Sequence, residues 1–360
     1  MYDIIVVGAG PAGAMAAKYL AASGQKVLLI QKNLSFKKPC GGGIRLDAFN
    51  EFDIDKKWIK SIVNELVLET KQHSIAYDIS HIPLAIVDRV SFDKALRNDA
   101  REAGAVLLEA KATDIDVTAF GVRVGVDDGV KDKVYEAKYL IAADGVHSFV
   151  RKKMRNEEVP AHLTHYSDIL ALQTNKCHIY FGTDMAKGAY GWRFPHHDGT
   201  NIGVPASENK NNMYELFNFL DIKKDEKIRG YKIPVWEDPI FYDKRIFYVG
   251  DAAGQVLPCT YEGIYYAMKS AKILSEVIVE DADHDSYEKR WNTLYLKKFS
   301  ILKRLEKLFL HHDFMINLMM KTVKKPEVQK KVLSLWMDQY EIKINLRFFG
   351  KILKNIFIKR

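Results

Sequence analysis

A glycine-rich turn between a buried strand and a helix constrains this chain more than any other feature of its sequence. Residues 3–7 are apolar enough for a buried parallel strand, and the motif Gly8-Ala-Gly10-Pro-Ala-Gly13 follows directly. An alanine-rich helix is expected over residues 11–23, and a second apolar strand over residues 26–30. In such a βαβ unit this spacing predicts a dinucleotide site. The glycines allow a tight turn, close approach of a pyrophosphate and packing of the helix on the strand.

The position at the end of the second strand departs from the usual pattern. An acidic residue is expected there to bind the adenosine ribose, but this chain has Gln31 followed by Lys32. A glutamine can still hydrogen-bond a ribose hydroxyl, without the charge-assisted strength of a carboxylate. We therefore expect a weaker ribose contact and an unchanged phosphate site.

Composition narrows the class of protein. The chain has 360 residues, of which 48% are hydrophobic and 28% charged, so two or three globular domains are expected and intrinsic disorder is not. Its three cysteines are too few for a disulfide framework or a four-cysteine zinc site, and no metal-ligand motif or nucleophile elbow appears. The sequence opens directly into a strand and has no apolar run that would span a bilayer, which predicts a cytoplasmic protein.

Positive charge is concentrated near the C-terminus. Residues 291–360 carry a net charge of +11, against −3 for residues 1–290. The segments 301–310 and 348–360 mix basic and apolar residues at helical spacing. Two interpretations stay open: helices packed on the body with a solvated basic face, or a peripheral anchor on the inner face of an anionic membrane. Nucleic-acid binding is not expected, because no recognition motif accompanies the charge.

The order of the predicted elements indicates an α/β architecture (α+β overall) with a discontinuous first domain. We expect a Rossmann-like dinucleotide domain with an inserted antiparallel-sheet substrate domain and a helical C-terminus. The expected boundaries are 1–60, 85–158 and 240–285 for the dinucleotide domain, 61–84 and 159–239 for the sheet domain, and 286–360 for the basic helical region. Strands are expected over residues 115–126 and 133–142. The alternating stretches 62–69, 74–79, 166–181 and 190–204 suggest the antiparallel sheet.

Three motifs further along the chain indicate which dinucleotide binds. Asp144-Gly145 resembles the Asp-Gly motif of flavoprotein hydroxylases and their relatives. Gly250-Asp251-Ala-Ala-Gly, followed by Pro258 and Gly263-Ile264, resembles their second flavin motif. Arg89 lies where an arginine of that family approaches FAD, and Ala112 and Thr113 fall where its backbone contacts adenine. The resemblance implies FAD in a fold of the p-hydroxybenzoate hydroxylase type, with Asp251 on the ribityl chain.

Two more segments narrow the resemblance. Pro39-Cys40-Gly41-Gly42-Gly43 and Tyr190-Gly-Trp192-Arg-Phe194-Pro195 are similar to motifs of the geranylgeranyl reductase family of FAD-dependent enzymes, and the similarity covers about residues 1–280. That family saturates isoprenoid double bonds. The resemblance therefore implies an isoprenoid or lipid-linked substrate. It leaves the electron donor open between NAD(P)H and another donor, which includes a donor protein. The family's aromatic motif ends in Gly-x-Gly, whereas Gly203-Val-Pro205 stands here, so the pocket mouth is expected to be shaped differently.

The aromatic and cysteine motifs suggest how the chemistry is arranged. Tyr190, Trp192 and Phe194 alternate along one strand, so they form either a wall for an apolar substrate or one side of a sheet core. Cys40 is either a thiol near the reactive flavin edge, acting as proton donor, or a small filler in a flexible loop. Cys259 lies in the other flavin-facing segment, but a redox pair with Cys40 is not favoured. Cys177 is expected to be buried.

The favoured function is FAD-dependent reduction of C=C bonds. The alternatives are an FAD-dependent monooxygenase acting on a small aromatic or apolar substrate, and a membrane-associated flavoprotein without catalysis. The expected catalytic residues are Cys40, Tyr190, Trp192 and Phe194, and no metal site is expected. The expected cofactor-binding residues are Gly8, Gly10, Pro11, Ala12, Gly13, Gln31, Lys32, Cys40, Gly41, Gly42, Gly43, Arg89, Ala112, Thr113, Asp144, Gly250, Asp251, Pro258, Gly263 and Ile264.

Overall fold

The first βαβ unit forms the centre of the larger sheet. In the computed structural model, which describes residues 1–196 and 198–337, strand β1 (Tyr2–Val7) leads through the glycine-rich turn into helix α1 (Pro11–Ala22) and strand β2 (Val27–Gln31). The sheet has the order β17-β18-β11-β1-β2-β8, and β1 pairs in parallel with both β2 and β11. The other strands are β8 (Val106–Glu109), β11 (Asp132–Ala142), β17 (Tyr242–Asp243) and β18 (Ile246–Tyr248). The expected α/β fold class is confirmed.

One expected strand of this sheet is two strands. Residues 115–126 were predicted as a single strand, but β9 (Lys111–Val117) and β10 (Val122–Asp127) form an antiparallel hairpin. The hydroxyl of Thr118 accepts hydrogen bonds from the backbone N–H groups of Phe120 and Gly121, at 3.3 and 3.1 Å. This side-chain turn reverses the chain within a stretch whose apolar alternation looks continuous.

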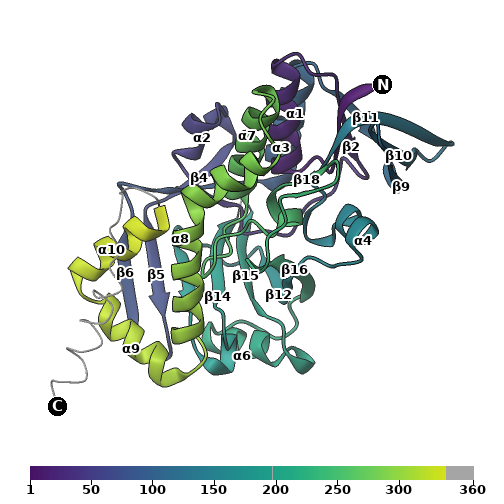
Figure 1. Cartoon of the computed structure of the whole chain (residues 1–360). Helices are drawn as coiled ribbons and strands as arrows, with labels where there is room; N and C mark the ends of the chain where they lie inside the picture. Colours follow the sequence, from purple (N-terminus) through teal and green to yellow (C-terminus); the bar gives the residue numbers. More distant parts are fainter. Residues whose placement is uncertain (197, 338–360) are drawn as a thin grey trace.

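Three helices cover one face of the large sheet. They pack closely on one another because several of the buried residues of the central helix are small. Helix α1 packs against α3 (Arg89–Glu102) and α7 (Ile264–Val279), as Figure 1 shows. Ala14, Ala16 and Ala17 of α1 are fully buried there. Helix α3 begins after Asp88, whose carboxylate accepts from the backbone N–H groups of Val90 and Ser91. This carboxylate satisfies N–H groups that have no partner within the helix.

A second, seven-stranded sheet has the order β16-β12-β15-β14-β13-β5-β6. Its strands are β5 (Glu65–Glu69), β6 (Ser74–Asp78), β12 (Ala161–Ile169), β13 (Cys177–Tyr180), β14 (Gly191–His196), β15 (Gly199–Pro205) and β16 (Arg229–Pro234). The alternating stretches 166–181 and 190–204 both fall in this sheet, and each contains parts of two strands with a chain reversal between them. Helices α5 (Thr183–Ala186) and α6 (Asn211–Phe219) pack on β15. A small third sheet has the order β3-β7-β4 and consists of β3 (Gly43–Arg45), β7 (Leu84–Val87) and β4 (Ile59–Val63).

The C-terminal part that the structure describes, up to residue 337, is helical and packs on the body. Helix α8 (Asp285–Phe309) buries Trp291, Tyr295, Phe299 and Leu302, which recur at helical spacing. Helices α9 (Asp313–Val323) and α10 (Pro326–Met337) lie beside β5 and β6 (Figure 1) and share an apolar cluster with them. The expected amphipathic segment 301–310 falls in α8 and the residue after it, whereas 348–360 lies outside the described residues.

Candidate active site

A cavity of about 1000 Å³ joins the two sheets and the C-terminal helices. At one end it is lined by the glycine-rich turn and the ends of β1 and β2, through Val7 and Ile30. At the other end it is lined by apolar residues of the second sheet and by residues of α8, α9 and α10. One continuous space therefore reaches from the expected nucleotide site to an apolar compartment.

The structure places most of the predicted site residues around this one cavity. Tyr190, Trp192, Phe194, Cys40 and most of the predicted cofactor residues are in its lining. The predicted residues in the lining on the cofactor side are Gly8, Gly10, Pro11, Ala12, Gln31, Lys32, Cys40, Gly41, Gly42, Gly43, Arg89, Ala112, Asp144, Asp251, Gly263 and Ile264. Four others, Gly13, Thr113, Gly250 and Pro258, lie outside the lining.

The glycine-rich turn has the geometry that its spacing predicts. Gly8 has φ +98°, and a Cβ there would lie 2.4 Å from the carbonyl oxygen of Ala143. A Cβ on Gly13 would lie 1.8 Å from the carbonyl oxygen of Gly8, so this glycine serves helix-on-strand packing. At Gly10, by contrast, a Cβ would meet no described atom within 4 Å. The backbone at Gly10 therefore faces open space at the start of α1.

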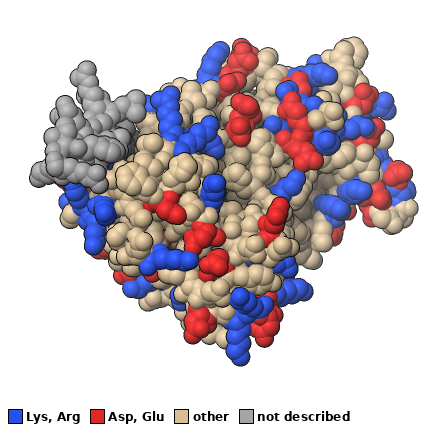
Figure 2. Space-filling model, turned by 90° about the horizontal axis from the view of Figure 1, so that it is seen from below, with Lys and Arg blue, Asp and Glu red and all other residues tan. Residues whose placement is uncertain are grey.

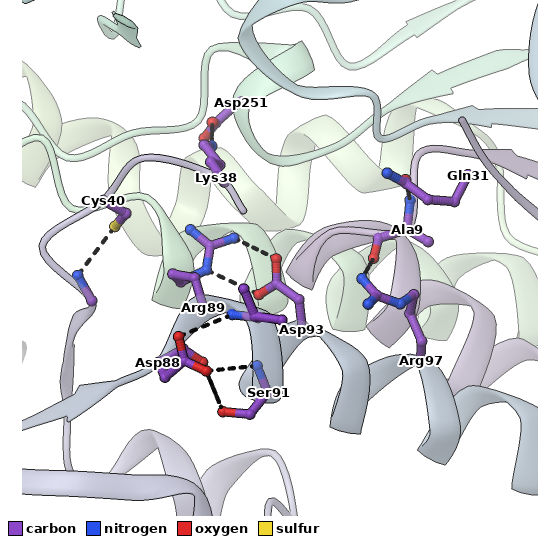
Figure 3. A network of polar contacts seen from close by, with 12 residues as sticks. Ala9, Gln31, Lys38, Cys40, Asp88, Arg89, Ser91, Asp93, Arg97 and Asp251 are labelled. Atoms are coloured by element: carbon purple, nitrogen blue, oxygen red, sulfur yellow. Dashed lines mark hydrogen bonds and ion pairs between the residues drawn. The ribbon is translucent and has the colours of Figure 1, made fainter. Parts of the chain in front are cut away.

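Gln31 contacts the turn itself. Its Oε1 accepts a hydrogen bond from the backbone N–H of Ala9 at 2.7 Å (Figure 3). Its Nε2 donates to the carbonyl oxygen of Asn33 at 3.1 Å. The guanidinium of Arg97 lies on the other side of the turn, 3.5 Å from the carbonyl oxygen of Ala9. Gln31 thus stabilises the glycine-rich turn in addition to lying beside the expected ribose site.

Arg89 lies beneath the cysteine loop. Its guanidinium makes two hydrogen bonds to the carboxylate of Asp93, at 2.9 and 2.7 Å, and the side chains of both residues are buried (Figure 3). Burial works to lower the pKa of Arg89, but the Asp93 carboxylate and the Cys40 thiol outweigh it and the pKa is raised. Arg89 is therefore a permanent cation next to Cys40.

The cysteine loop is held in a compact turn against the aromatic strand. Gly42 has φ +71°, and its backbone N–H donates to the Cys40 Sγ at 3.4 Å. A Cβ on Gly41 would lie 2.4 Å from the Phe194 ring. These two positions have to be glycine for the loop to reach the strand, which brings the two motifs of the family resemblance into direct contact.

Lys38, which was not among the predicted site residues, also lies in the cavity lining. Its ammonium pairs with the carboxylate of Asp251, which lies in the short helix Gly250–Ala253 after β18 (Figure 3). Burial works to lower the pKa of Lys38, but the Asp251 carboxylate more than offsets it, so the pKa is raised. The only advance signal was its place two residues before Cys40.

Asp144 holds the turn after β11. Its carboxylate accepts from the Ser148 hydroxyl at 2.6 Å and from the backbone N–H of Val150 at 3.0 Å. Burial raises the pKa of Asp144. The Ser148 hydroxyl in turn accepts from the backbone N–H of Arg151 at 3.0 Å, at the start of α4 (Phe149–Arg155). The Asp-Gly motif therefore fixes the local backbone at the edge of the cavity.

Tyr190, Trp192 and Phe194 of the aromatic strand line the cavity. This position is the one required if the three rings form a wall for an apolar substrate. Trp192 donates from its indole N–H to Asn201 Oδ1 at 2.7 Å. Tyr190 donates to the carbonyl oxygen of Thr260, and its ring stacks on Tyr261. Cys177 is fully buried, as expected, and burial raises its pKa.

The main feature that the sequence analysis missed is the C-terminal wall. The C-terminal helices were expected either to pack on the body with a solvated basic face or to anchor the protein on a membrane. Neither interpretation included what the described helices do, which is to line the apolar end of the cavity. The lining residues there include Leu302, Leu305, Phe309, Met319, Val323, Val328, Leu333 and Trp336. Amphipathic spacing indicated that these helices bury one face, but it could not indicate that the face adjoins a cavity.

A dinucleotide such as FAD fits the polar end of this cavity. The first turn of α1 is Pro11-Ala-Gly-Ala, which is uncharged, and its N-terminus favours an anion. Lys32, Arg97 and Lys111 line the same end. The open space at Gly10 and this donor set match a pyrophosphate between two nucleoside halves.

Comparison with known proteins supports the same assignment. Residues 1–229 match the sequence profile of the family described as FAD binding domain. The chain is 30% identical to the chloroplastic geranylgeranyl diphosphate reductase of Nicotiana tabacum, over 85% of this chain and 74% of that protein. It is 29% identical to digeranylgeranylglycerophospholipid reductase 1 of Methanosphaera stadtmanae, over 83% of this chain and 80% of that protein.

Solved structures agree on the fold. A geranylgeranyl bacteriochlorophyll reductase-like protein from Thermoplasma acidophilum superposes with a TM-score of 0.69 at 24% identity, covering 93% of this chain and 99% of that chain. A p-nitrophenol 4-monooxygenase from Pseudomonas putida gives a TM-score of 0.74 at 14% identity, covering 92% of this chain and 96% of that chain. At these identities, the two structures support the shared flavoprotein fold.

Proposed function

Because the chain belongs to the geranylgeranyl reductase family of FAD-dependent oxidoreductases, we propose that it saturates C=C bonds of an isoprenoid or lipid-linked substrate. The relatives named above are reductases of geranylgeranyl groups on a diphosphate and on a glycerophospholipid. When bound, reduced FAD supplies the hydride for such a reaction. The chain must then align the alkene, exclude water and deliver the matching proton.

The observation that carries this proposal is the continuity of the cavity. Its polar end has the phosphate turn and its other end is lined by aliphatic and aromatic side chains from the second sheet and α8–α10. An isoprenoid chain is long, apolar and flexible, so it suits an elongated apolar compartment better than a small aromatic substrate does. The cysteine loop and the aromatic strand lie where the two ends meet.

We assign Cys40 the proton for the alkene carbon next to the one that receives hydride. Cys40 and Arg89 both line the cavity. The Arg89 cation can balance the charge of the Cys40 thiolate that is left after proton transfer. In the balanced reaction, one carbon gains a hydride and its neighbour gains a proton. Tyr190, Trp192 and Phe194 are proposed to hold the alkene against the cofactor.

The electron donor and the location of the protein are finer proposals. We propose that electrons come from NAD(P)H or another donor, which includes a donor protein.

In the described part of the chain, no helix has the length and apolar character needed to cross a bilayer. Basic and acidic side chains are interspersed on the face in Figure 2. We propose a cytoplasmic protein whose contact with an anionic membrane, if made by residues 345–360, falls outside the described residues.

Two experiments test these proposals. The holoprotein is reduced under nitrogen and mixed with polyprenyl lipids, and the products are analysed by mass spectrometry. A reductase gives products heavier by two hydrogens per bond, whereas a monooxygenase gives an oxygen-dependent product heavier by one oxygen atom. A flavoprotein without catalysis gives neither product.

For the membrane contact, deletion of residues 345–360 is expected to reduce flotation of the protein with anionic liposomes. Unchanged flotation would refute the proposed membrane contact.

A further inference from the structure

A short loop between the cofactor side and the lipid side of the cavity has an unusual backbone. The loop Leu257–Glu262, called the strap here, lies just before α7 and is closed by backbone hydrogen bonds of 2.9 Å (Tyr261 N–H to Leu257 O) and 3.0 Å (Leu257 N–H to Glu262 O). Within it, Cys259 has φ +69° and Tyr261 has φ +51°. These left-handed conformations suit glycine and are unfavourable for residues with a Cβ, most of all for a bulky one. Such strain persists only where surrounding contacts enforce it.

The contacts that hold the strap come from the C-terminal wall and the aromatic strand. Glu306 of α8 accepts from the backbone N–H of Cys259 at 2.9 Å, and the Cys259 thiol donates to the carbonyl oxygen of Leu302 at 3.0 Å. Tyr190 donates to the carbonyl oxygen of Thr260. The indole N–H of Trp336, on α10, donates to Glu262 at 3.3 Å. The strap is thus fixed from several elements at once.

The strap lies between two apolar clusters, and the side chains of Cys259 and Tyr261 pack against different ones. Cys259 packs against the core that contains α1 and α7, whereas Tyr261 packs against the apolar cluster shared by β5, β6, α9 and α10. The Tyr261 ring stacks on the Tyr190 ring, with centroids 5.5 Å apart. It also makes a T-shaped contact with the His162 ring, with centroids 6.0 Å apart. Tyr261 also lines the cavity. Its ring therefore occupies space at the junction of the two compartments.

The ring of Tyr261, and not its hydroxyl, makes the contacts to the protein that hold it in place. The Tyr261 hydroxyl is buried and finds no hydrogen-bond partner among the described residues. Tyr77, by contrast, lies in the same apolar cluster and donates to the carbonyl oxygen of Val323 at 3.1 Å. The Tyr261 hydroxyl therefore contributes no hydrogen bond from the described residues to the position of the strap. The strained backbone therefore serves to place an aromatic ring at this point.

We propose that Tyr261 is a specificity-determining residue whose ring limits how far an isoprenoid chain can extend from the α8–α10 compartment past the cysteine loop. The ring would thereby set the chain length accepted and the double bond that reaches the cofactor. This inference rests on the proposed function, because it concerns the substrate of that same cavity.

The test compares three variants on polyprenyl substrates of increasing chain length. Tyr261→Phe keeps the ring and is expected to retain the wild-type preference. Tyr261→Gly and Tyr261→Ala remove the ring, and the ratio of kcat/KM for the longer to the shorter substrate is expected to rise about 10-fold or more, the effect of one or more methylenes in a fitted apolar pocket. Tyr214→Ala, which removes a tyrosine ring on α6 outside the cavity lining, is expected to leave the ratio unchanged.

A stability measurement keeps the inference testable if a variant is poorly active. Gly tolerates φ +51° and Ala does not, so Tyr261→Gly is expected to unfold at a higher urea concentration than Tyr261→Ala. If the wild type reduces no prenyl substrate, the proposed function fails. If the wild type is active and the ring-less variants keep its chain-length ratio, or Tyr261→Phe loses it, the role of the Tyr261 ring is refuted.

Discussion

Lys38 and Asp251 are 213 residues apart in the sequence, yet their side chains form an ion pair in the cavity lining. Lys38 belongs to the loop that carries Cys40. Asp251 follows β18 and lies against the start of α7, where a Cβ on Gly263 would come within 3.1 Å of its Oδ1. The pair therefore connects the cysteine loop to the segment that the family resemblance places on the ribityl chain of FAD.

Removing the ammonium of Lys38 is expected to destabilise the cofactor-free protein. In Lys38→Met, the Asp251 carboxylate, whose side chain is 10% exposed, loses its charged partner. We expect the free energy of unfolding to fall by about 1.5–3 kcal/mol, the range for hydrogen bonds to charged groups. Urea unfolding measures this change.

A double-mutant cycle separates the pair from the individual residues. Asp251→Asn is expected to cost less in the Lys38→Met background than in the wild type. Additive effects would contradict a direct interaction. Lys57→Met serves as the control, because the pair of Lys57 with Asp55 is exposed and contributes little.

The first βαβ unit of the fold could be predicted because its signals are local. Residues 3–30 combine two short apolar strands, a glycine-rich turn and an alanine-rich helix, and each signal supports the next. The hairpin of β9 and β10 was missed because Thr118 forms the turn with its side chain, without a Pro or an Asn-Gly pair. Alternation alone cannot locate such a reversal.

Cys40→Ser is expected to impair turnover while FAD stays bound. Serine is nearly isosteric but holds its proton far more tightly than a thiol, so proton delivery is expected to slow turnover about 100-fold or more. FAD affinity, measured by absorbance titration, is expected to stay within about 2-fold, since phosphate binding lies at the glycine-rich turn. Cys177→Ala is the control, because Cys177 is buried outside the cavity lining. Full activity of Cys40→Ser would show that Cys40 is not the proton donor and serves only in packing.

The parts of the site that could not be predicted depend on tertiary contacts. Nothing local relates Lys38 to Asp251. Similarly, Cys259 and Tyr261 carry no sequence signal for a left-handed backbone, because contacts from Glu306, Leu302 and Tyr190 impose it. The alternation of Tyr190, Trp192 and Phe194 did indicate a shared side, and all three line the cavity.

Stability is expected to fall in mild acid partly through His165 on β12. Burial, and then the ammonium of Lys210, lower the pKa of His165 below its usual value of 6.5. Its Nδ1 is buried without a hydrogen-bond partner among the described residues. The unfolded chain therefore binds more protons than the folded chain just below pH 6.5, so the free energy of unfolding drops as the pH falls through this range.

The measurement compares the free energy of unfolding at about pH 7.5 and about pH 5.5. His165→Gln is expected to lose less stability between these values than the wild type. The exposed His81 provides the control, and His81→Gln is expected to keep the wild-type slope. Equal slopes for His165→Gln and the wild type would show that His165 stays uncharged or equally charged in both states.

Gly10→Ala is expected to separate cofactor binding from folding. A Cβ at Gly10 would contact no described atom within 4 Å, and its φ of −74° is accessible to alanine. The free energy of unfolding without FAD is therefore expected to change by less than about 0.5 kcal/mol. The same methyl group would occupy the space through which a pyrophosphate approaches the start of α1, so FAD affinity is expected to fall about 10-fold or more. Gly13→Ala is the contrasting variant, because its Cβ would lie 1.8 Å from the Gly8 oxygen and should destabilise the fold itself. If Gly10→Ala binds FAD as tightly as the wild type, the pyrophosphate does not lie on this turn.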